Sequence, residues 1–324
     1  MRQWKPRQSL RFAATIAIVG LACSGPSLPS GSGGAPDYTF ADRIVFSRYC
    51  CALYSAFVIH PDGTGLRPLL ATPGNVDVSS YSVSPDGKRV ALTESAYQFD
   101  AIHIVDSVGH SDTRFPADHA TSYAMPRWSP DGTRIAFTES WNASMTVGPD
   151  SSRHVLVALA DGSGAIVIGD SAILGSGVAW SSDGQRVIYS RIGKLVEVNA
   201  DGSTTIPRII ANTDSAFDPA VSPDGTKILY ARLSPDAWPG HLAVVGIDGS
   251  APALITNGAD RDWRPAWSPD GLRIVFERDP DPLTNTDTAP ILGLINADGS
   301  GYARLNTGEA AHGQFAPTWG PATH

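Results

Sequence analysis

The pentapeptide WSPDG at Trp267–Gly271 recurs along the chain and decides the fold. The other copies are WSPDG at Trp128–Gly132, WSSDG at Trp180–Gly184, and VSPDG at Val83–Gly87 and Val221–Gly225. Proline restrains φ for the second position of a turn, aspartate bonds nearby backbone groups, and glycine accepts a positive φ. Each copy therefore predicts a tight hairpin turn between two strands.

Each turn is followed by a short run rich in β-branched and aromatic residues. These runs are RVALTE (Arg89–Glu94), RIAFTE (Arg134–Glu139), RVIYSR (Arg186–Arg191), KILYAR (Lys227–Arg232) and RIVFER (Arg273–Arg278). A variable loop, a second apolar run with another Asp-Gly turn, and a short closing run follow, as in HLAVVGIDGS (His241–Ser250) and PALIT (Pro252–Thr256). Such four-stranded units, repeated about every 40–50 residues, are typical of propeller blades.

The two ends of the repeat region hold complementary pieces of one blade. DRIVFSR (Asp42–Arg48) matches a second strand with no first strand before it. FAPTWGP (Phe315–Pro321) matches a first strand with no second strand after it. The sequence therefore predicts an all-β, six-bladed propeller over residues 42–321, with four-stranded blades and a C-terminal strand that completes the N-terminal blade.

The pattern WSPDG(T/K)RI(A/V)F, with (N/A)ADGS one strand later, resembles the WD-like repeat of TolB-type six-bladed propellers. The same pattern occurs in the propeller domains of prolyl-oligopeptidase-type enzymes. TolB itself carries an α/β domain before its propeller, and the peptidases carry an α/β-hydrolase domain; we expect neither in this chain. The resemblance implies a non-catalytic scaffold that binds an envelope protein or peptide.

The N-terminus has the features of an export signal. A basic stretch, MRQWKPRQSLR, precedes the short apolar run Phe12–Ala22 and then Cys23. Residues 1–23 resemble a bacterial lipoprotein signal peptide, which predicts lipidation at Cys23, and residues 24–41 are a Gly/Ser/Pro tether. Gly20 stands where an aliphatic residue is usual, so simple cleavage is the alternative. The predicted location is the periplasm or outer membrane, lipid-anchored at Cys23, or the secreted fraction after cleavage.

The composition limits the classes of molecule that the protein is expected to bind. The formal charge of −8 argues against a nucleic-acid partner. We predict a monomer without a cofactor or metal, in contact with the membrane only through the lipid anchor. Cys50 and Cys51 are adjacent, and either a strained vicinal disulfide or two free thiols fits the sequence.

The two faces of the predicted disc differ. One, the turn face, carries the Ser-Pro-Asp-Gly and later Asp-Gly turns, which are short and uniform. The other, the loop face, carries variable loops such as Glu139–Arg153 and Arg278–Pro290. Binding sites are usually built from variable loops on a rigid scaffold, so the loop face is the predicted interaction surface.

Charged residues at two repeat positions are the candidate binding residues on this face. The residues that end the second strands are Arg48, Glu94, Glu139, Arg191, Arg232 and Arg278. They predict a polarised rim whose arginines accept carboxylates, unless they pair with local acids such as Asp279 and Asp281. Candidates near the channel, at the start of first strands, are Asp218, Arg261, Asp262 and Arg264. These four either face a ligand or form salt bridges between blades.

Two further readings concern aromatic and histidine residues. Trp128, Trp180, Trp267 and Trp319 occupy one repeated position, which predicts packing between blades rather than a stacked ligand. No G-x-S-x-G, H-E-x-x-H or P-loop motif occurs. The alternative function is a metal-dependent carbohydrate lyase or hydrolase on the loop face. Its ligands would be drawn from His119, His154, His241 and His312, none of which lie at ligand spacing.

Overall fold

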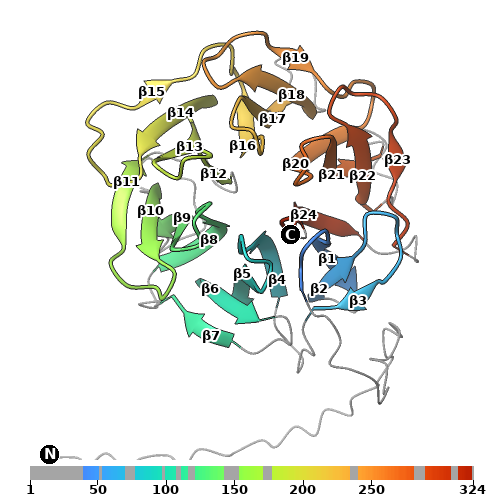
Figure 1. Ribbon diagram of the computed structural model, residues 1–324, viewed down its shortest axis with the longest axis horizontal. Coiled ribbons are helices and arrows are strands. Elements are labelled where there is room, and N and C mark those ends of the chain that lie inside the picture. Colours follow the sequence, from blue (N-terminus) through green and yellow to red (C-terminus); the bar gives the residue numbers. More distant parts are fainter. Residues whose placement is uncertain are drawn as a thin grey trace, which may run out of the picture.

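The computed structural model describes residues 39–50, 53–69, 77–96, 99–106, 111–115, 121–141, 153–170, 177–233, 240–280, 289–307 and 313–322. In these residues, 24 strands form six four-stranded antiparallel sheets arranged around a central axis (Figure 1). The prediction of a six-bladed β-propeller is confirmed. Among the described residues no helix has the length and hydropathy needed to cross a membrane.

The blades are numbered in the order in which they follow along the chain. Within each blade, the strands are given from the innermost to the outermost. Blade 1 holds β24 (Gln314–Trp319), β1 (Ile44–Cys50), β2 (Leu53–Ile59) and β3 (Arg67–Pro68). Blade 2 holds β4 (Asp77–Val83), β5 (Arg89–Ala96), β6 (Phe99–Asp106) and β7 (Ser111–Arg114). Blade 3 holds β8 (Thr121–Trp128), β9 (Arg134–Trp141), β10 (Arg153–Leu159) and β11 (Ile166–Asp170).

The remaining three blades repeat this order. Blade 4 holds β12 (Val178–Trp180), β13 (Arg186–Arg191), β14 (Lys194–Asn199) and β15 (Arg208–Ile209). Blade 5 holds β16 (Ala216–Val221), β17 (Lys227–Leu233), β18 (Gly240–Gly246) and β19 (Ala253–Leu254). Blade 6 holds β20 (Arg261–Trp267), β21 (Arg273–Asp279), β22 (Ile291–Asn296) and β23 (Ala303–Arg304).

The C-terminal strand closes the ring as predicted. β24 pairs antiparallel with β1, with Trp319 opposite Ile44 and Gln314 opposite Arg48. The Gly320 N–H donates to the Arg43 carbonyl at 2.8 Å and extends the pairing beyond the strand. Figure 1 shows β24, at the red end of the chain, on the axis side of the blue strand β1. Both edges of β1 are therefore covered by neighbouring strands.

The hydrophobic core lies between neighbouring blades. Each of the six buried clusters draws its side chains from two adjacent sheets, so blades stack face to face around the ring. The second strands are apolar at almost every position because both of their faces are covered. Phe40, at the end of the predicted tether, is fully buried in the cluster between blades 1 and 2. The packed part of the chain thus includes Phe40.

The Ser-x-Asp-Gly turns repeat one hydrogen-bond pattern. In blade 6 the Ser268 hydroxyl donates to the Asp270 carboxylate at 2.5 Å and accepts from the Arg273 N–H at 2.8 Å. The Gly271 N–H donates to the Ser268 carbonyl, and Gly271 has a φ of 70°. The serine–aspartate bond recurs in the turns of blades 2 to 5. The repeated motif is thus a hairpin lock that sets strand register.

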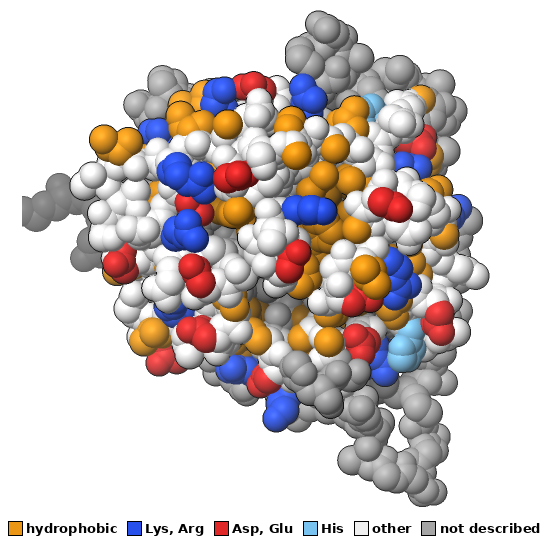
Figure 2. Space-filling model, turned by 45° about the horizontal axis from the view of Figure 1, so that its top comes forward, with side chains coloured by type: hydrophobic (Ala, Val, Ile, Leu, Met, Phe, Trp, Pro, Cys, Tyr) orange, Lys and Arg blue, Asp and Glu red, His pale blue; other side chains and the backbone are white. Residues whose placement is uncertain are grey.

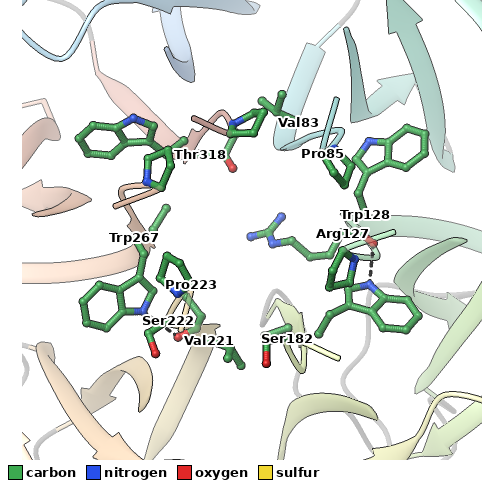
Figure 3. A pocket seen from close by; sticks show the side chains of 18 of the residues that line it. Val83, Pro85, Arg127, Trp128, Ser182, Val221, Ser222, Pro223, Trp267 and Thr318 are labelled. Carbon is green, nitrogen blue, oxygen red and sulfur yellow. Dashed lines mark hydrogen bonds between the residues drawn. The ribbon is translucent and has the colours of Figure 1, made fainter. Parts of the chain in front are cut away.

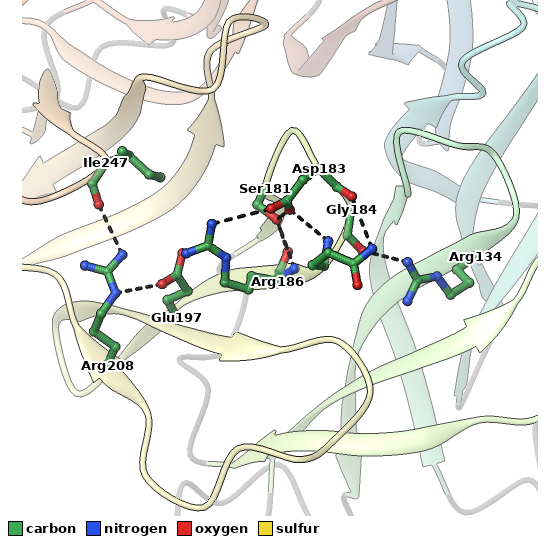
Figure 4. A network of polar contacts seen from close by, with 9 residues as sticks. Arg134, Ser181, Asp183, Gly184, Arg186, Glu197, Arg208 and Ile247 are labelled. Atoms are coloured by element: carbon green, nitrogen blue, oxygen red, sulfur yellow. Dashed lines mark hydrogen bonds and ion pairs between the residues drawn. The ribbon is translucent and has the colours of Figure 1, made fainter.

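Arginine and tryptophan side chains join neighbouring blades. The first residue of a second strand stacks on the tryptophan of the next blade: Arg89 over Trp128, Arg134 over Trp180 and Arg273 over Trp319, at 4.7, 4.9 and 5.2 Å from the ring centroids. Where the next blade carries valine, the arginine takes another partner. Arg186 is in blade 4, and the next blade carries Val221 at the repeated position. Arg186 instead pairs with the buried Glu197 at 3.2 Å (Figure 4).

Candidate functional site

A cavity of about 380 Å³ lies on the axis at the turn face. The last residues of the innermost strands and the turns that follow them line it, from all six blades. Figure 3 shows side chains all round the opening, with Trp128 and Trp267 on opposite sides of it. The described cavity therefore lies on the face opposite the predicted loop-face site.

One lining residue departs from the repeat. The residue before the repeated tryptophan or valine is Ser82, Ala179, Ala220, Ala266 and Thr318 in blades 2, 4, 5, 6 and 1. In blade 3 it is Arg127, whose guanidinium projects toward the middle of the cavity (Figure 3). Arg127 was not among the residues predicted from the sequence, although it is the one charged residue at this position of the repeats.

Below this cavity the channel narrows to a waist. A second cavity of only about 10 Å³ lies there, lined in part by Arg127, Asp218 and Arg264. Arg264 pairs with the buried Glu277 at 2.9 Å, and the Asp218 carboxylate accepts a hydrogen bond from the Gly177 N–H at 2.9 Å. Asp218 and Arg264, which were predicted to lie near the channel, therefore both line it.

Backbone bulges at the waist turn these residues toward the axis. Five innermost strands have a residue with positive φ three positions before the repeated tryptophan or valine: Ser80, Met125, Asp218, Arg264 and Ala316, at 42° to 57°. The strand register shifts at each of these places. In blade 4 the corresponding residue is Gly177. Non-glycine residues in this conformation are strained, and their clustering on the axis marks the waist as a specialised part of the fold.

Burial controls the electrostatics of the waist. Desolvation raises the pKa of Glu277, although the neighbouring Arg264 cation acts in the opposite direction. Desolvation also lowers the pKa of Arg127, against the attraction of Asp218 and with the repulsion of Arg264. For both groups, burial outweighs the compensation from nearby charges.

Three predicted residues take part in two sets of ion pairs at the loop-face end of blade 6. Arg278 binds both carboxylate oxygens of Asp262, at 2.7 and 3.0 Å, and also pairs with Asp260 at 3.2 Å. Arg261 pairs with Asp279 at 3.8 Å. Asp262 lies directly opposite Arg278 in the register of β20 and β21, which explains the pairing.

The other three predicted arginines have different surroundings. Arg48 is 6% exposed and lies 5.3 Å from the centroid of the Phe57 ring. Arg191 pairs with Asp170 of blade 3 at 3.3 Å, and its side chain is 35% exposed. Arg232 is exposed at the end of β17. Arg191 and Arg232, on neighbouring blades, are thus the accessible cations among the second-strand ends.

The acidic members of the predicted rim pair with histidines. Glu94 contacts His103 at 2.8 Å, and Glu139 contacts His154 at 3.0 Å. Within the described part of the chain, no group of three or more His, Cys, Asp or Glu residues is placed to hold a metal ion. His119 and His312, considered for a metal site, lie outside the described residues.

Other predictions also fall outside the described structure. Cys23, the signal peptide and most of the tether lie before residue 39, and Cys51 and the side chain of Cys50 are likewise not described.

On the face in Figure 2, basic and acidic side chains are interspersed rather than gathered into a basic patch. Such mixing gives that face no broad positive field.

Comparison with known proteins agrees with this architecture. The family model described as TolB beta propeller domain matches residues 39–323. Dipeptidyl-peptidase 5 of Porphyromonas gingivalis is 32% identical over 95 residues, which are 27% of this chain and 14% of that protein. An uncharacterized protein of Agrobacterium fabrum is 27% identical over 218 residues, or 62% of this chain and 69% of the relative.

Solved structures share the fold. TolB from Acinetobacter baumannii superposes with a TM-score of 0.67 at 19% identity, over 87% of this chain and 67% of that chain. A putative TolB from Agrobacterium tumefaciens gives 0.61 at 21% identity, over 81% and 88%. An oligogalacturonate lyase in complex with manganese gives 0.52 at 12% identity, over 82% and 74%. Since the family model spans all six blades, this chain belongs to the TolB β-propeller domain family.

Proposed function

We propose that this protein is a non-catalytic scaffold of the cell envelope that binds an acidic protein or peptide partner on its loop face. The exposed Arg232 of blade 5, together with the partly exposed Arg191 of blade 4, whose Nε also contacts Asp170, is the observation that carries the proposal. Planar guanidinium groups bind carboxylates through paired hydrogen bonds, so two accessible arginines suit a partner with acidic side chains.

The surroundings of the other loop-face arginines support this choice of location. Arg278 is held by Asp262 and Asp260, and Arg48 is buried, so neither presents an open guanidinium to a partner. The partner surface is therefore centred on blades 4 and 5. The TolB-like propeller fold is in general a scaffold, and family membership supports protein binding as its use.

The envelope location rests on the N-terminal signal and on the family. The basic and apolar segments before Cys23 direct export, and the likeness to TolB-type propellers supports a place in the envelope. Lipidation at Cys23 then holds the propeller at the membrane through the Gly/Ser/Pro-rich residues 24–41. No observation on the described residues favours the alternative of a metal-dependent lyase or hydrolase.

Charge reversal tests the proposal. The double variant R191E/R232E is compared with K88E, which reverses an exposed charge on the turn face. Both are used as bait on envelope extracts of the source cells, after circular dichroism has shown that each is folded. We expect K88E to retain the protein captured by the natural sequence and R191E/R232E to lose it. Equal capture by both variants would remove the loop-face assignment.

A further inference from the structure

We propose that the turn-face cavity is a second binding site, which takes an apolar ligand carrying a single carboxylate held by Arg127. The ligand is a small organic acid or the carboxylate end of a peptide, two sources of the same chemistry. This site lies on the face opposite the proposed partner surface and does not depend on it.

The lining of the cavity has the composition of a small-molecule site. Seven prolines, four tryptophans, three alanines and three valines make up most of the wall, five serines add polar groups, and Arg127 is the one charged residue among the described residues that line it. Ligand sites usually pair such apolar walls with a few polar groups that fix orientation. Its volume of about 380 Å³ also lies within the usual range of about 300–1,000 Å³ for such sites.

The repeat shows that Arg127 is not required for packing. Five blades build the same position with serine, alanine or threonine. Taking a guanidinium out of water is unfavourable unless it gains charged or polar partners. A cation at this one place, directed toward the middle of the cavity in Figure 3, therefore indicates a ligand that supplies the partner.

The hydrogen bonds of Arg127 leave room for that partner. Its Nη1 donates to two neutral carbonyls, of Tyr81 at 3.0 Å and of Pro126 at 2.9 Å. Guanidinium carries five N–H donors, so these two bonds occupy only part of its capacity. A carboxylate that enters from the turn face has the remaining edge of the plane as its binding site.

The other charges at the waist compensate the Arg127 cation only in part, because Arg264 repels it and Asp218 attracts it. Arg264 and Glu277 pair with each other, and Asp218 is the other carboxylate on this side of the channel. An ideal Cβ on Gly177 would lie 3.6 Å from Arg127 Nη2 and 3.9 Å from Asp218 Oδ1, so both groups lie close to Gly177, and Asp218 attracts the Arg127 cation. Asp218 lines the small waist cavity but not the turn-face cavity. With one cation in the wall, the cavity selects a monoanion.

The lining tryptophans provide a direct readout. Trp128, Trp180, Trp267 and Trp319 all contact the cavity, so a bound ligand changes their fluorescence. The probes are hexanoate, benzoate and acetyl-Pro-Leu with a free carboxylate, each matched with its uncharged amide. We expect at least one carboxylate to bind, and its amide to bind about tenfold more weakly or worse. Binding by the acids or by the dipeptide identifies the source.

One variant of the cavity wall, at Arg127, and one of the waist, at Asp218, separate binding from folding. R127A introduces the residue that blades 4, 5 and 6 already carry at this position and should weaken carboxylate binding by about ten- to a hundredfold. Asp218→Asn removes the carboxylate that competes with the ligand for Arg127, so this variant should bind the carboxylate probes more tightly. Because unfolding cannot tighten binding, D218N decides the question even if R127A is unstable. K88E serves as the control with unchanged affinity.

Three results would each overturn the proposal. One is that no carboxylate probe changes the tryptophan emission. Another is that carboxylates and amides bind equally well. The third is that D218N binds the carboxylates no more tightly than the natural sequence, or that a folded R127A binds them as tightly as the natural sequence.

Discussion

The guanidinium of Arg134 lies 4.9 Å from the ring centroid of Trp180 and joins blade 3 to blade 4. The same arginine donates from Nη2 to the Gly184 carbonyl at 2.6 Å, so it contacts both the indole and the turn that follows it. Figure 4 shows Arg134 reaching across to that turn. Three of the six blade junctions use an arginine on an indole in this way.

Stacking of Arg134 on Trp180 predicts an energetic coupling between them. In a double-mutant cycle of R134Q and W180F, we expect a coupling of about 0.5–1 kcal/mol, typical of a partly exposed cation–π pair. Urea denaturation of the four proteins measures it. The control cycle is R186Q with V221A, at the junction where valine replaces tryptophan. A coupling no larger than in the control would contradict the role assigned to the stack.

Removal of Arg278 should destabilise blade 6 strongly. Asp262 is fully buried, so R278M leaves its carboxylate without the cation that binds both oxygens. We expect a loss of about 3–5 kcal/mol in the free energy of unfolding. The double variant D262L/R278M removes both charges and should recover much of that loss. If R278M is as stable as the double variant in urea, the pair does not stabilise the blade.

The turn aspartates predict a loss of stability in acid. Hydrogen bonds lower the pKa of Asp131 from 3.8 to about 2, and the largest contribution comes from the Ser129 hydroxyl. The pKa values of Asp183, Asp224 and Asp270 are also lowered, and there too the largest contribution comes from the hydroxyl of the turn serine. A folded pKa below the unfolded value stabilises the fold above the unfolded value, and this contribution disappears as the pH falls toward the folded pKa. We expect the thermal midpoint to fall between about pH 4 and pH 2.

Asp131→Asn isolates one of these contributions. Asparagine keeps a hydrogen-bond acceptor in the turn but does not titrate, so the decline in the thermal midpoint over this pH range should become shallower. Lys88→Glu, which leaves that turn intact, is not expected to lose the steep decline. An identical pH profile for D131N and the natural sequence would show that Asp131 does not contribute.

Lipidation at Cys23 predicts a change of location on mutation. Cys23→Ser removes the thiol that would carry the lipid, so the exported protein should move from the membrane fraction to the soluble envelope fraction. Labelling of cells with a clickable palmitate analogue and fractionation measure both effects. Label on the natural sequence and none on C23S is the expected result. A natural protein without label would favour simple cleavage.

The fold could be predicted from the sequence because each repeat contains the residues that form its own turns and strands. The Ser-Pro-Asp-Gly turns and apolar runs define each blade, and the fragments at Asp42–Arg48 and Phe315–Pro321 reveal how the ring closes. The paired strands β1 and β24 are formed by these fragments. Spacing along the chain was sufficient for this because every blade has the same order of strands.

The side-chain pairs at the candidate site depend on register, which the spacing did not supply. The sequence suggested Asp279 or Asp281 as neutralising acids for Arg278, yet Asp262 is directly opposite it across the strand pair. The inward direction of Asp218 and Arg264 depends on backbone bulges, which could not be predicted from the residue types at these positions. Arg127 was visible as an exception to the repeat, but its place in a cavity required the closed ring.

Site-specific photo-crosslinking in intact cells tests the central claim most directly. A photoreactive amino acid is placed at Arg232 on the loop face and, in a second strain, at Lys88 on the turn face. The proposed scaffold predicts one dominant protein adduct from position 232, lost when R191E is added, and none of that adduct from position 88. Equal adducts from both positions, or no protein adduct from position 232, would contradict it.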